Sequence, residues 1–506
     1  MMSNTIRLNT IDNVVVARAD LEPGNEIPGE GLICQNNIPF GHKVAASPIA
    51  RGEPVRKYGQ IIGVATTQIS PGEHVHVHNL DLMDFDRDYA FGVEARPTVF
   101  FPEEEQAHFQ GIIRPDGRVA TRNYIGIIST VNCSASVARH IAETFGEQRL
   151  GDFPNIDGVV PICHGTGCAI ADKGEGFEIL QRTLGGYAQH PNFAAVLLIG
   201  LGCEVIQAES LTKEIKTNSS IPLHTLNIQD HGGSMATVQR GVDLVKEMLP
   251  VTNRVERCPV PANHLILGLE CGGSDGYSGI TANPALGRAV DLMVQHGGTA
   301  ILSETPEIYG AEHLLTRRAM SRDVGEKLIG RIQWWKEYTS KRGEELDNNP
   351  SPGNKAGGLT TILEKSLGAA AKSGTTNLVD VVGYAHPVTA KGLVFMDTPG
   401  YDPVSVTGMV AGGANIVCFT TGRGSVFGCK PAPVIKLATN TTLYDNMLDD
   451  MDLNCGSIID GRTTIDEMGE EIFRMILDIA SGQKTKSEQI GIGDNEFVPW
   501  QIGAVL

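Results

Sequence analysis

The sequence predicts a small all-β module followed by a larger α/β body, and three observations support this prediction. Up to about residue 92, short β-like runs alternate with turn dipeptides such as Pro-Gly, and no long helical pattern occurs. From Gly111 onward, short apolar runs alternate with helical segments, which is typical of a mostly parallel sheet covered on both faces. Between the two parts, residues 93–110 carry prolines and an acidic run, as linkers do.

The size and composition of the chain limit its class. A chain of 506 residues can form two or three domains with substantial cores. Its formal net charge of −18 argues against a nucleic-acid partner, because binding phosphates requires basic patches. The N-terminal residues lack the apolar core of a signal peptide, and no apolar run is long enough to span a bilayer. The ten scattered cysteines are interpreted as reduced thiols, so we expect a cytoplasmic protein with no membrane partner.

Short apolar runs mark the expected strands of the α/β body. Their length and their position between helical segments favour strands that are buried on both faces. They are Tyr124–Thr130, Gly158–Ile162, Ala195–Ile199, Leu265–Leu269, Ala300–Leu302 and Asn415–Phe419.

Helical patterns lie between these runs. A helix is predicted at Val137–Phe145, after the first strand. Another is predicted to begin with Asn283 as its N-cap and Pro284 as its first residue, because these residue types favour those positions. Residues Leu314–Lys341 form a long, charged helical stretch. Asn348–Gly358 is too rich in Pro, Gly and Asn for either a helix or a strand.

Side chains capable of chemistry follow each of these strands. In open α/β sheets, ligands bind beyond the carboxyl ends of the strands, so this recurrence predicts a site there. A single cysteine at such a position is as well explained as a small buried apolar residue. In strand order, the residues are Cys133; Cys163, His164 and Cys168; Cys203 and Glu204; Cys271 and Asp275; Glu304 and Glu307; and Thr420, Thr421 and Arg423.

The segment from Glu270 to Pro284, ECGGSDGYSGITANP, is the most informative stretch of the chain. Its glycines allow the backbone to approach a ligand, and the N-terminus of the helix that follows favours anions. Ser274, Asp275 and Ser278 add polar groups that a plain turn does not need. The segment therefore predicts a ligand-binding turn, with a tight turn around a structural cysteine as the alternative.

Histidines recur in the β module. His74, His76 and His78 are spaced by two, so on a strand they would share one face. That face could bind a metal or a substrate, or it could simply be solvated. His42 lies in a separate turn, and its spacing alone is a weak signal.

Two loops of the α/β body offer further groups that could bind an anion. Asn354 and Lys355 lie in the irregular loop, which could be a lid over a carboxylate or an ordinary surface loop. Arg423 follows a strand and could bind a carboxylate through two parallel hydrogen bonds, or it could form a structural ion pair. Neither GxGxxG nor GxxxxGK[ST] occurs in a strand-turn-helix setting, so a nucleotide cofactor is not expected.

Several of these motifs together resemble the altronate/galactarate dehydratase family of sugar-acid hydro-lyases. They are ECGGSDGYSGITANP, GLGCE, NPSPGNKAGG, EKSLG at Glu364–Gly368, and TTGRG. The first 92 residues resemble the SAF-type β-clip domain of that family, through DNVVVA, GHKVA and KYG.

The resemblance implies dehydration of an aldonic or aldaric acid to a 2-keto-3-deoxy acid, with Fe²⁺ as the usual metal. It also implies three domains and a homodimer: the SAF domain at 1–92, a linker at 93–110, a middle α/β domain with dimer contacts at 111–255, and a Rossmann-like catalytic domain at 256–506. GEHVHVHN and ETPEIYGAE are similar to the altronate type, whereas residues 154–161 and the helix Glu326–Tyr338 are closer to the galactarate type. Altronate is therefore the preferred substrate and galactarate the alternative, and a sugar-acid-binding protein without catalysis is the alternative of another class.

Each candidate residue receives a role from the reaction and from its motif. Removing a proton next to a carboxylate and expelling the neighbouring hydroxyl requires a base, an acid and a Lewis acid. We assign catalysis to His164, Lys355 and Asp275. The metal ligands are expected among Cys168, Cys203, Cys271 and Glu304, which could hold a single iron or an iron–sulfur cluster. Substrate binding is assigned to His42, His76, His78, Ser274, Ser278, Asn283, Asn354 and Arg423.

Overall fold

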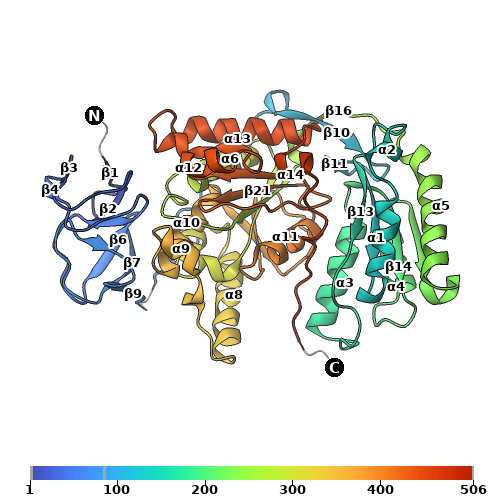
Figure 1. Ribbon diagram of the computed structural model, residues 1–506, viewed down its shortest axis with the longest axis horizontal. Helices are drawn as coiled ribbons and strands as arrows, with labels where there is room; N and C mark the ends of the chain where they lie inside the picture. Colours follow the sequence, from blue (N-terminus) through green and yellow to red (C-terminus); the bar gives the residue numbers. More distant parts are fainter. Residues whose placement is uncertain (1–3, 84–86, 504–506) are drawn as a thin grey trace.

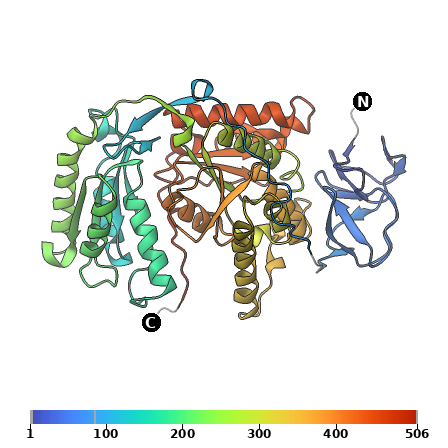
Figure 2. The same cartoon turned by 180° about the vertical axis from the view of Figure 1, so that it is seen from behind.

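The computed structural model describes residues 4–83 and 87–503. Three bodies lie in a row (Figure 1): the N-terminal β domain at one end, the C-terminal α/β domain in the centre, and the middle α/β domain at the other end. The view from behind shows the same order, so the C-terminal domain separates the other two (Figure 2). In the described residues, no helix is long and apolar enough to cross a membrane.

The N-terminal domain is built from short antiparallel strands, and residues 4–83 contain no helix, as the sequence predicts. One sheet has the order β1-β2-β5-β8, a second the order β6-β7-β9, and β3 pairs with β4. Its core comprises two buried apolar clusters, which include Val15 and Val55. The strands are β1 Thr5–Ile6, β2 Val14–Ala17, β3 Glu26–Ile27, β4 Leu32–Ile33, β5 Lys43–Ala45, β6 Pro54–Lys57, β7 Gln60–Ala65, β8 His74–Val75 and β9 Leu80–Asp81.

The segment that leaves this domain runs along the C-terminal domain. The backbone N–H of Arg96 donates to Asn377 Oδ1 at 3.1 Å, and that of Phe101 donates to the carbonyl of Gln295 at 2.9 Å. After the 3₁₀ turn η1 (Glu103–Glu105), strands β10 (His108–Ile113), β11 (Val119–Ala120) and β16 (Cys258–Pro261) form a small antiparallel sheet beside the middle domain (Figure 1).

The middle domain contains a parallel four-stranded sheet of order β13-β12-β14-β15. Its strands are almost entirely apolar because helices cover both faces, which buries a cluster on each side. The strands are β12 Tyr124–Ser129, β13 Gly158–Ile162, β14 Phe193–Gly200 and β15 Leu223–Asn227. The helices are α1 Ala135–Glu143, α2 Glu147–Leu150, α3 Glu175–Ala188, α4 Ala208–Asn218 and α5 Ser234–Thr252.

The C-terminal domain contains a parallel seven-stranded sheet of order β19-β20-β18-β17-β21-β22-β23, so the mostly parallel α/β prediction is confirmed. Its strands are β17 Ile266–Cys271, β18 Thr299–Leu302, β19 Leu378–Val382, β20 Leu393–Met396, β21 Ile416–Thr421, β22 Val434–Ala438 and β23 Leu453–Asn454. Its helices are α6 Ala282–Gln295, α7 Glu312–Thr316, α8 Arg322–Ser340, α9 Pro352–Ala356, α10 Ile362–Ala370, α11 Asp402–Ala411, α12 Thr441–Asn446, α13 Ile465–Ala480 and α14 Lys486–Gln489.

Three local predictions about helices are wrong. The stretch Leu314–Lys341 is divided between α7 and α8, because Ala319 bridges to Leu378 of β19 and Ser321 then caps α8. Asn348–Gly358 is not wholly irregular, since Ser351 and Asn354 form a capping box that begins α9. Helix α6 starts earlier than predicted: its N-cap is Thr281, so Asn283 lies inside the helix.

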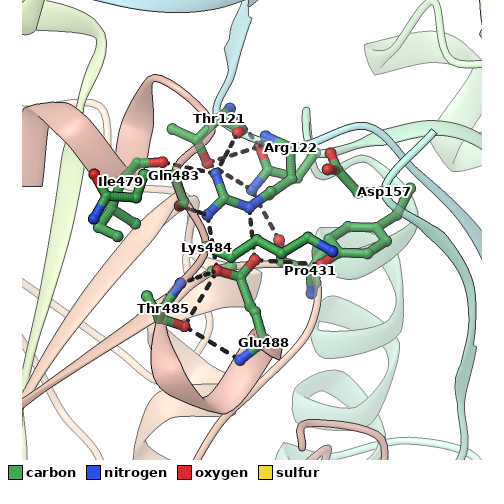
Figure 3. Close-up of polar contacts among 12 residues, drawn as sticks. Thr121, Arg122, Asp157, Pro431, Ile479, Gln483, Lys484, Thr485 and Glu488 are labelled. Atoms are coloured by element: carbon green, nitrogen blue, oxygen red, sulfur yellow. Dashed lines mark hydrogen bonds and ion pairs between the residues drawn. The ribbon is translucent and has the colours of Figure 1, made fainter. Parts of the chain in front are cut away.

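A buried arginine joins the middle and C-terminal domains. Arg122 is 1% exposed and donates from Nε and Nη2 to the carboxylate oxygens of Glu488 at 2.6 and 2.8 Å. Its remaining N–H groups reach the carbonyls of Thr121, Ile479 and Gln483 at 2.7–2.8 Å (Figure 3). Because one residue satisfies acceptors on both domains in a rigid bidentate geometry, it fixes their relative placement.

Candidate functional site

Buried acidic and thiol side chains gather at the carboxyl ends of β17 and β18, which are neighbours in the large sheet. Cys271, Glu304 and Glu307 each bring a ligand atom within 4.8 Å of the other two, and all three are buried. Glu270, Glu304 and Asp402 form an overlapping group under the same distance limit. We call these five residues the acidic pocket. Its position agrees with the rule that ligands bind beyond the carboxyl ends of parallel strands.

Two lysines face the acidic pocket, one from α10 and one from the 3₁₀ turn that follows it, η7 (Ala371–Ser373). Lys365 Nζ lies 2.7 Å from Glu307 Oε1, and Lys372 Nζ lies 3.6 Å from Glu304 Oε2. Both lysines are buried. The pocket therefore combines carboxylates with compensating ammonium groups away from bulk water, where electrostatic interactions are strong.

Burial strongly raises the pKa values of four side chains of the acidic pocket. It raises the pKa of Glu270 to about 8 and that of Cys271 to about 11. It also raises the pKa of Glu304 well above its usual range, with the carboxylates of Glu270 and Glu307 adding to the effect. Burial raises the pKa of Asp402 to about 6. Perturbed groups gathered at one strand edge are typical of functional sites.

Glu304 is the residue that best fits a metal ligand. Both of its carboxylate oxygens are buried without a hydrogen-bond partner in the described structure, and so is Oε2 of Glu307. Its backbone adopts a left-handed conformation with φ of 65°, a strain that tends to occur at functional sites. Carboxylates and a thiolate are suitable donors for a divalent ion such as Fe²⁺, so the residues present fit the metal that the sequence predicts.

The glycine after Cys271 is required by the packing of Asp402. A Cβ at Gly272 would collide with the Oδ2 atom of Asp402, which stands at the first turn of α11. The carboxylate of Asp402 therefore lies directly against the turn that follows β17.

The same turn forms the seam with the N-terminal domain. Gly276 donates to the carbonyl of Gly357 at 2.8 Å, and a Cβ at Gly276 would collide with the carbonyl oxygen of Gly41. Tyr277 reaches across the seam and donates from its hydroxyl to the carbonyl of Ala17 at 2.5 Å. Backbone from the β domain, the β17 turn and α9 thus meets at one point.

A buried ion triad reinforces this seam. Glu364 of α10 accepts from Lys43 at 2.8 Å and from Lys57 at 2.9 Å, and the side chains of all three residues are at most 1% exposed. Burial alone would raise the pKa of Glu364, but the two ammonium groups hold it well below its usual range. Lys43 and Lys57 come from β5 and β6, so the triad joins the N-terminal domain to the C-terminal domain.

The histidines of the N-terminal domain cluster beside the same seam. His42 Nδ1 lies 3.0 Å from His74 Nε2, and His42 Nε2 lies 3.2 Å from the carbonyl of Ala356 in α9. The His76 ring stacks on that of His74 with centroids 5.3 Å apart, and the His78 ring lies 5.4 Å from His74. Burial lowers the pKa of His74 and of His76 to about 3, so both rings are neutral at physiological pH.

The histidine row is thus confirmed as a cluster, but not as a single strand. Strand β8 ends at Val75, and His76 and His78 lie in the turn that follows it. His42, from the turn before β5, completes the cluster.

Several predicted substrate-binding residues direct their polar groups into the turn itself. The carboxylate of Asp275 accepts hydrogen bonds from Ser278, Tyr277, Thr439 and Asn440 at 3.0–3.1 Å. These groups shape the turn, and no carboxylate oxygen of Asp275 is left without a donor. Asp275 and Ser278 thus hold the turn in shape, and the catalytic and substrate-binding roles assigned to them stay predictions.

The side chains of Asn354 and Asn283 also form hydrogen bonds with neighbouring groups of the protein. Asn354 donates to the carbonyl of Ser274 at 2.9 Å, which fixes α9 on the β17 turn. Asn283 donates to the carbonyl of Gly368 at 2.9 Å and accepts from Thr420 at 2.6 Å. The sequence did not predict the direction of these side chains, and the ligand-binding role of the turn stays a prediction.

Lys355 and Arg423 lie nearer the solvent. Lys355 is half-buried in α9 and Arg423 is exposed after β21. A Cβ at Gly357 would come within 3.1 Å of both Arg423 Cδ and Asp275 Cβ, so the arginine stem lies beside the same turn. Arg423 therefore borders the turn after β17.

His164, Cys168 and Cys203 belong to the other sheet, in the middle domain. His164 is 6% exposed; Nε2 lies 3.1 Å from the carbonyl of Ser129, and Nδ1 lies 3.3 Å from the backbone nitrogen of Thr166. Burial lowers its pKa to about 4. Both ring nitrogens contact the local backbone, and the acid/base role assigned to His164 stays a prediction.

The thiols of the middle domain are not brought to the acidic pocket. Cys168 and Cys203 are exposed, and within the described residues no group of three close ligand atoms includes either of them. Of the predicted metal ligands, the structure brings together Cys271 and Glu304.

Sequence reasoning missed much of the acidic pocket and its lysines. Glu307 and Glu364 stood in motifs that the sequence analysis singled out, but received no role. Lys365 lies in the same EKSLG motif. Asp402 and Lys372 had no signal, because their elements are distant along the chain and join the site only through the fold.

Comparisons with known proteins agree with this arrangement. Family models match in order along the chain: the altronate/galactarate dehydratase SAF domain at residues 3–83, the second domain of D-galactarate dehydratase/altronate hydrolase at 111–253, and the C-terminal domain of D-galactarate/altronate dehydratase at 262–505.

Characterised relatives match over almost their whole length. Galactarate dehydratase (L-threo-forming) of Escherichia coli is 37% identical over 96% of this chain and 95% of its own. Altronate dehydratase of Bacillus subtilis is 34% identical over 96% and 97%, and that of Escherichia coli is 35% identical over 96% of each chain. With all three domains matched in order, the chain belongs to the altronate/galactarate dehydratase family.

Proposed function

We propose that this hydro-lyase family member removes water from a sugar acid, D-altronate, to give a 2-keto-3-deoxy acid. The observation that carries the proposal is the match to altronate dehydratases over 96% of the chain, SAF domain included. The histidine row of the SAF domain and the segment around Glu304, which are similar to the altronate type, support that substrate.

Galactarate is the second candidate. The galactarate dehydratase of Escherichia coli is 37% identical to this chain, slightly more than either altronate dehydratase. The two acids differ at the end remote from the reacting carbons, where galactarate carries a second carboxylate. Exposed Arg423 could bind such a group, so the choice depends on the rim of the site.

We further propose that Cys271, Glu304 and Glu307 hold Fe²⁺. When bound, a divalent ion of this kind acts as a Lewis acid that stabilises negative charge on oxygens of the substrate. Both oxygens of Glu304 and Oε2 of Glu307 lack a hydrogen-bond partner in the described structure, which supports this assignment. An iron–sulfur cluster is the alternative, for which the described structure gathers only Cys271 near the pocket.

The chain's own residues supply the proton transfers. Asp402 lies against Gly272 and takes the C2 proton at its carboxylate. Lys355 delivers a proton from Nζ to the hydroxyl that leaves C3, and the enol then ketonises without a redox partner. Lys365 and Lys372 provide positive charge near the developing enolate in a water-poor pocket.

Location and assembly follow as proposals of the same kind. The ten cysteines all lie in the described residues and are free thiols, which supports a cytoplasmic enzyme. We propose a homodimer formed through the middle domain. Helix α5 at the outer end of that domain exposes Met235 by 77% and Val251 by 62%, a surface that a second copy could cover (Figure 1). Light scattering after size-exclusion chromatography measures the mass; a monomer at micromolar concentration would contradict the dimer.

The test is an anaerobic assay of the purified protein with Fe²⁺, a thiol reductant and a panel of sugar acids, followed by a colour reaction for 2-keto-3-deoxy acids. We expect kcat/KM for D-altronate to exceed that for galactarate. The reverse order would make galactarate the substrate. If no sugar acid of the panel gave product, a binding protein without catalysis would be favoured. Exhaustive chelation should abolish turnover, and added Fe²⁺ should restore it.

A further inference from the structure

The histidine cluster of the N-terminal domain has a feature that substrate binding does not require. Strands β5 and β8 pair antiparallel, with Lys43 opposite Val75 and Val44 opposite His74. Continued by one residue, that register sets His42 opposite His76, and their ring centroids lie 4.9 Å apart. Cross-strand neighbours on one face are close enough for their side chains to interact, so the pairing itself brings the imidazoles of two strand ends together.

The ring nitrogens converge on one point. His42, His74 and His76 each offer a nitrogen, and these atoms lie within 4.8 Å of one another. His42 is 5% exposed and the other two are half-buried. Bonds of about 2.0–2.1 Å from a central ion to imidazole nitrogens require ligand separations in this range.

The tautomer of His42 leaves a lone pair facing the cluster, and His74 Nε2 donates to it in the metal-free protein. His42 Nε2 must donate to the carbonyl of Ala356, so its Nδ1 carries a lone pair, which points to His74 Nε2 at 3.0 Å. A backbone carbonyl that accepts from the outer nitrogen is the usual partner of a metal-bound histidine. The Nδ1 of His76 is buried and has no hydrogen-bond partner in the described structure. A buried polar atom of this kind is costly unless something binds it.

We propose that His42, His74 and His76 bind a divalent transition-metal ion through three imidazole nitrogens, at the seam between the SAF and C-terminal domains. Neutral imidazoles select ions such as Zn²⁺, Co²⁺ or Fe²⁺ over Mg²⁺ and Ca²⁺, which prefer oxygen ligands. The site is distinct from the acidic pocket, since it shares no residue with it and contains no thiol or carboxylate. It does not depend on which sugar acid the enzyme dehydrates.

The ion would lie at the seam, with all three ligands in the SAF domain. His42 is tied to Ala356 of α9, the residue after Lys355, while His74 begins β8 and His76 follows it. Three-nitrogen coordination leaves a further position open, as in sites that also bind water or substrate.

Titration of the metal-free protein with Co²⁺ tests the proposal, with bound metal measured by elemental analysis and the visible spectrum recorded. We expect wild type to bind one equivalent with a nitrogen-ligand spectrum, in addition to the ion of the acidic pocket, and His74→Ala and His76→Ala to lose that equivalent and its spectrum. His78→Ala, whose ring lies beside His74 but outside the three-nitrogen group, should keep it. Glu304→Gln should also keep it, which separates this site from the acidic pocket.

Circular dichroism confirms that each variant is folded before titration. Equal Co²⁺ content and identical spectra in wild type, His74→Ala and His76→Ala would overturn the proposal. So would unchanged metal binding accompanied by a raised KM, since the histidines would then bind substrate alone.

Discussion

At the scale of single residues, the structure separates groups that could act on a substrate from groups that hold the site in shape. Asp275 and Asn354 lie in motifs typical of the family, yet their polar atoms are used by neighbouring side chains and backbone. Glu304 and Glu307 retain buried oxygens without a hydrogen-bond partner in the described structure. Unsatisfied polar atoms, more than motif membership, therefore identify the groups available for chemistry.

Replacing the proposed base should lower turnover without disturbing the fold. We expect Asp402→Asn, which is nearly isosteric, to reduce kcat by roughly two to four orders of magnitude, the usual contribution of a positioned acid or base. Asp380→Asn is the matched control, because Asp380 lies on the same sheet in β19 and pairs with Lys327 at 2.9 Å near the surface. Steady-state kinetics measures both, and near-normal kcat for Asp402→Asn would remove Asp402 from the reaction.

The role of Lys355 can be tested by measuring whether its replacement changes kcat or KM. As a proton donor acting only in the transition state, Lys355→Ala should lower kcat by roughly two orders of magnitude with little change in KM. Lys336→Ala, in the exposed part of α8, should leave both constants unchanged. A raised KM with intact kcat would instead make Lys355 a carboxylate anchor.

At the scale of elements, the site depends on a few close backbone approaches. The turn after β17 touches Gly41 of the SAF domain and Gly357 of α9, with no side chain between them at Gly276. The sequence predicts that a ligand-facing turn stands here, because glycines, hydroxyls and a carboxylate follow an apolar strand. It does not reveal that the glycine faces another domain, since that contact joins residues more than two hundred positions apart.

A methyl group at Gly276 should separate these elements. We expect Gly276→Ala to loosen the SAF domain, because a Cβ there collides with a backbone carbonyl that cannot rotate away. Limited proteolysis should cleave the segment at residues 93–107 faster than in wild type. Gly353→Ala is the control, since its nearest neighbour would be Ser351 Oγ at 3.9 Å. Equal cleavage of Gly276→Ala and wild type would show that the seam tolerates the methyl group.

At the scale of the whole molecule, the order of β and α/β parts is predictable from sequence and the joints between them are not. Strand patterns and turn residues predict each sheet locally, and the seven-stranded parallel sheet agrees with them. The joints depend on single charged residues, such as Arg122 and Glu364, that are buried against partners far along the chain. Nothing in the local sequence around Arg122 distinguishes it from a surface arginine.

The joint at Arg122 should make stability depend on pH. Burial opposes the ionised form, but the Arg122 guanidinium holds the pKa of Glu488 below its usual range. A folded-state pKa below the unfolded value means that the stabilisation is fully present above the unfolded pKa of about 4.3. It is lost as the pH falls from there through the folded-state pKa. We expect Glu488→Gln to cost roughly 3 kcal/mol at pH 7, and the difference from wild type to shrink below about pH 4.

Urea denaturation at several pH values measures this difference. Glu467→Gln is the matched control, because Glu467 closes the same kind of capping box on α13 without an arginine partner. It should cost clearly less than Glu488→Gln, because Glu467 is exposed. A difference between Glu488→Gln and wild type that grows as the solution is acidified would contradict the assigned direction of the shift.

The central claim, that the acidic pocket of this family member dehydrates a sugar acid, is tested most directly by product formation. Purified protein reconstituted with Fe²⁺ is incubated anaerobically with D-altronate, and the 2-keto-3-deoxy acid is measured by NMR alongside Glu304→Gln. We predict continuous turnover by wild type and a loss of at least roughly two orders of magnitude in the variant, because both buried oxygens of Glu304 lack a hydrogen-bond partner in the described structure and are available to an ion. No product from D-altronate or galactarate with wild type, or undiminished turnover by Glu304→Gln, would contradict the account.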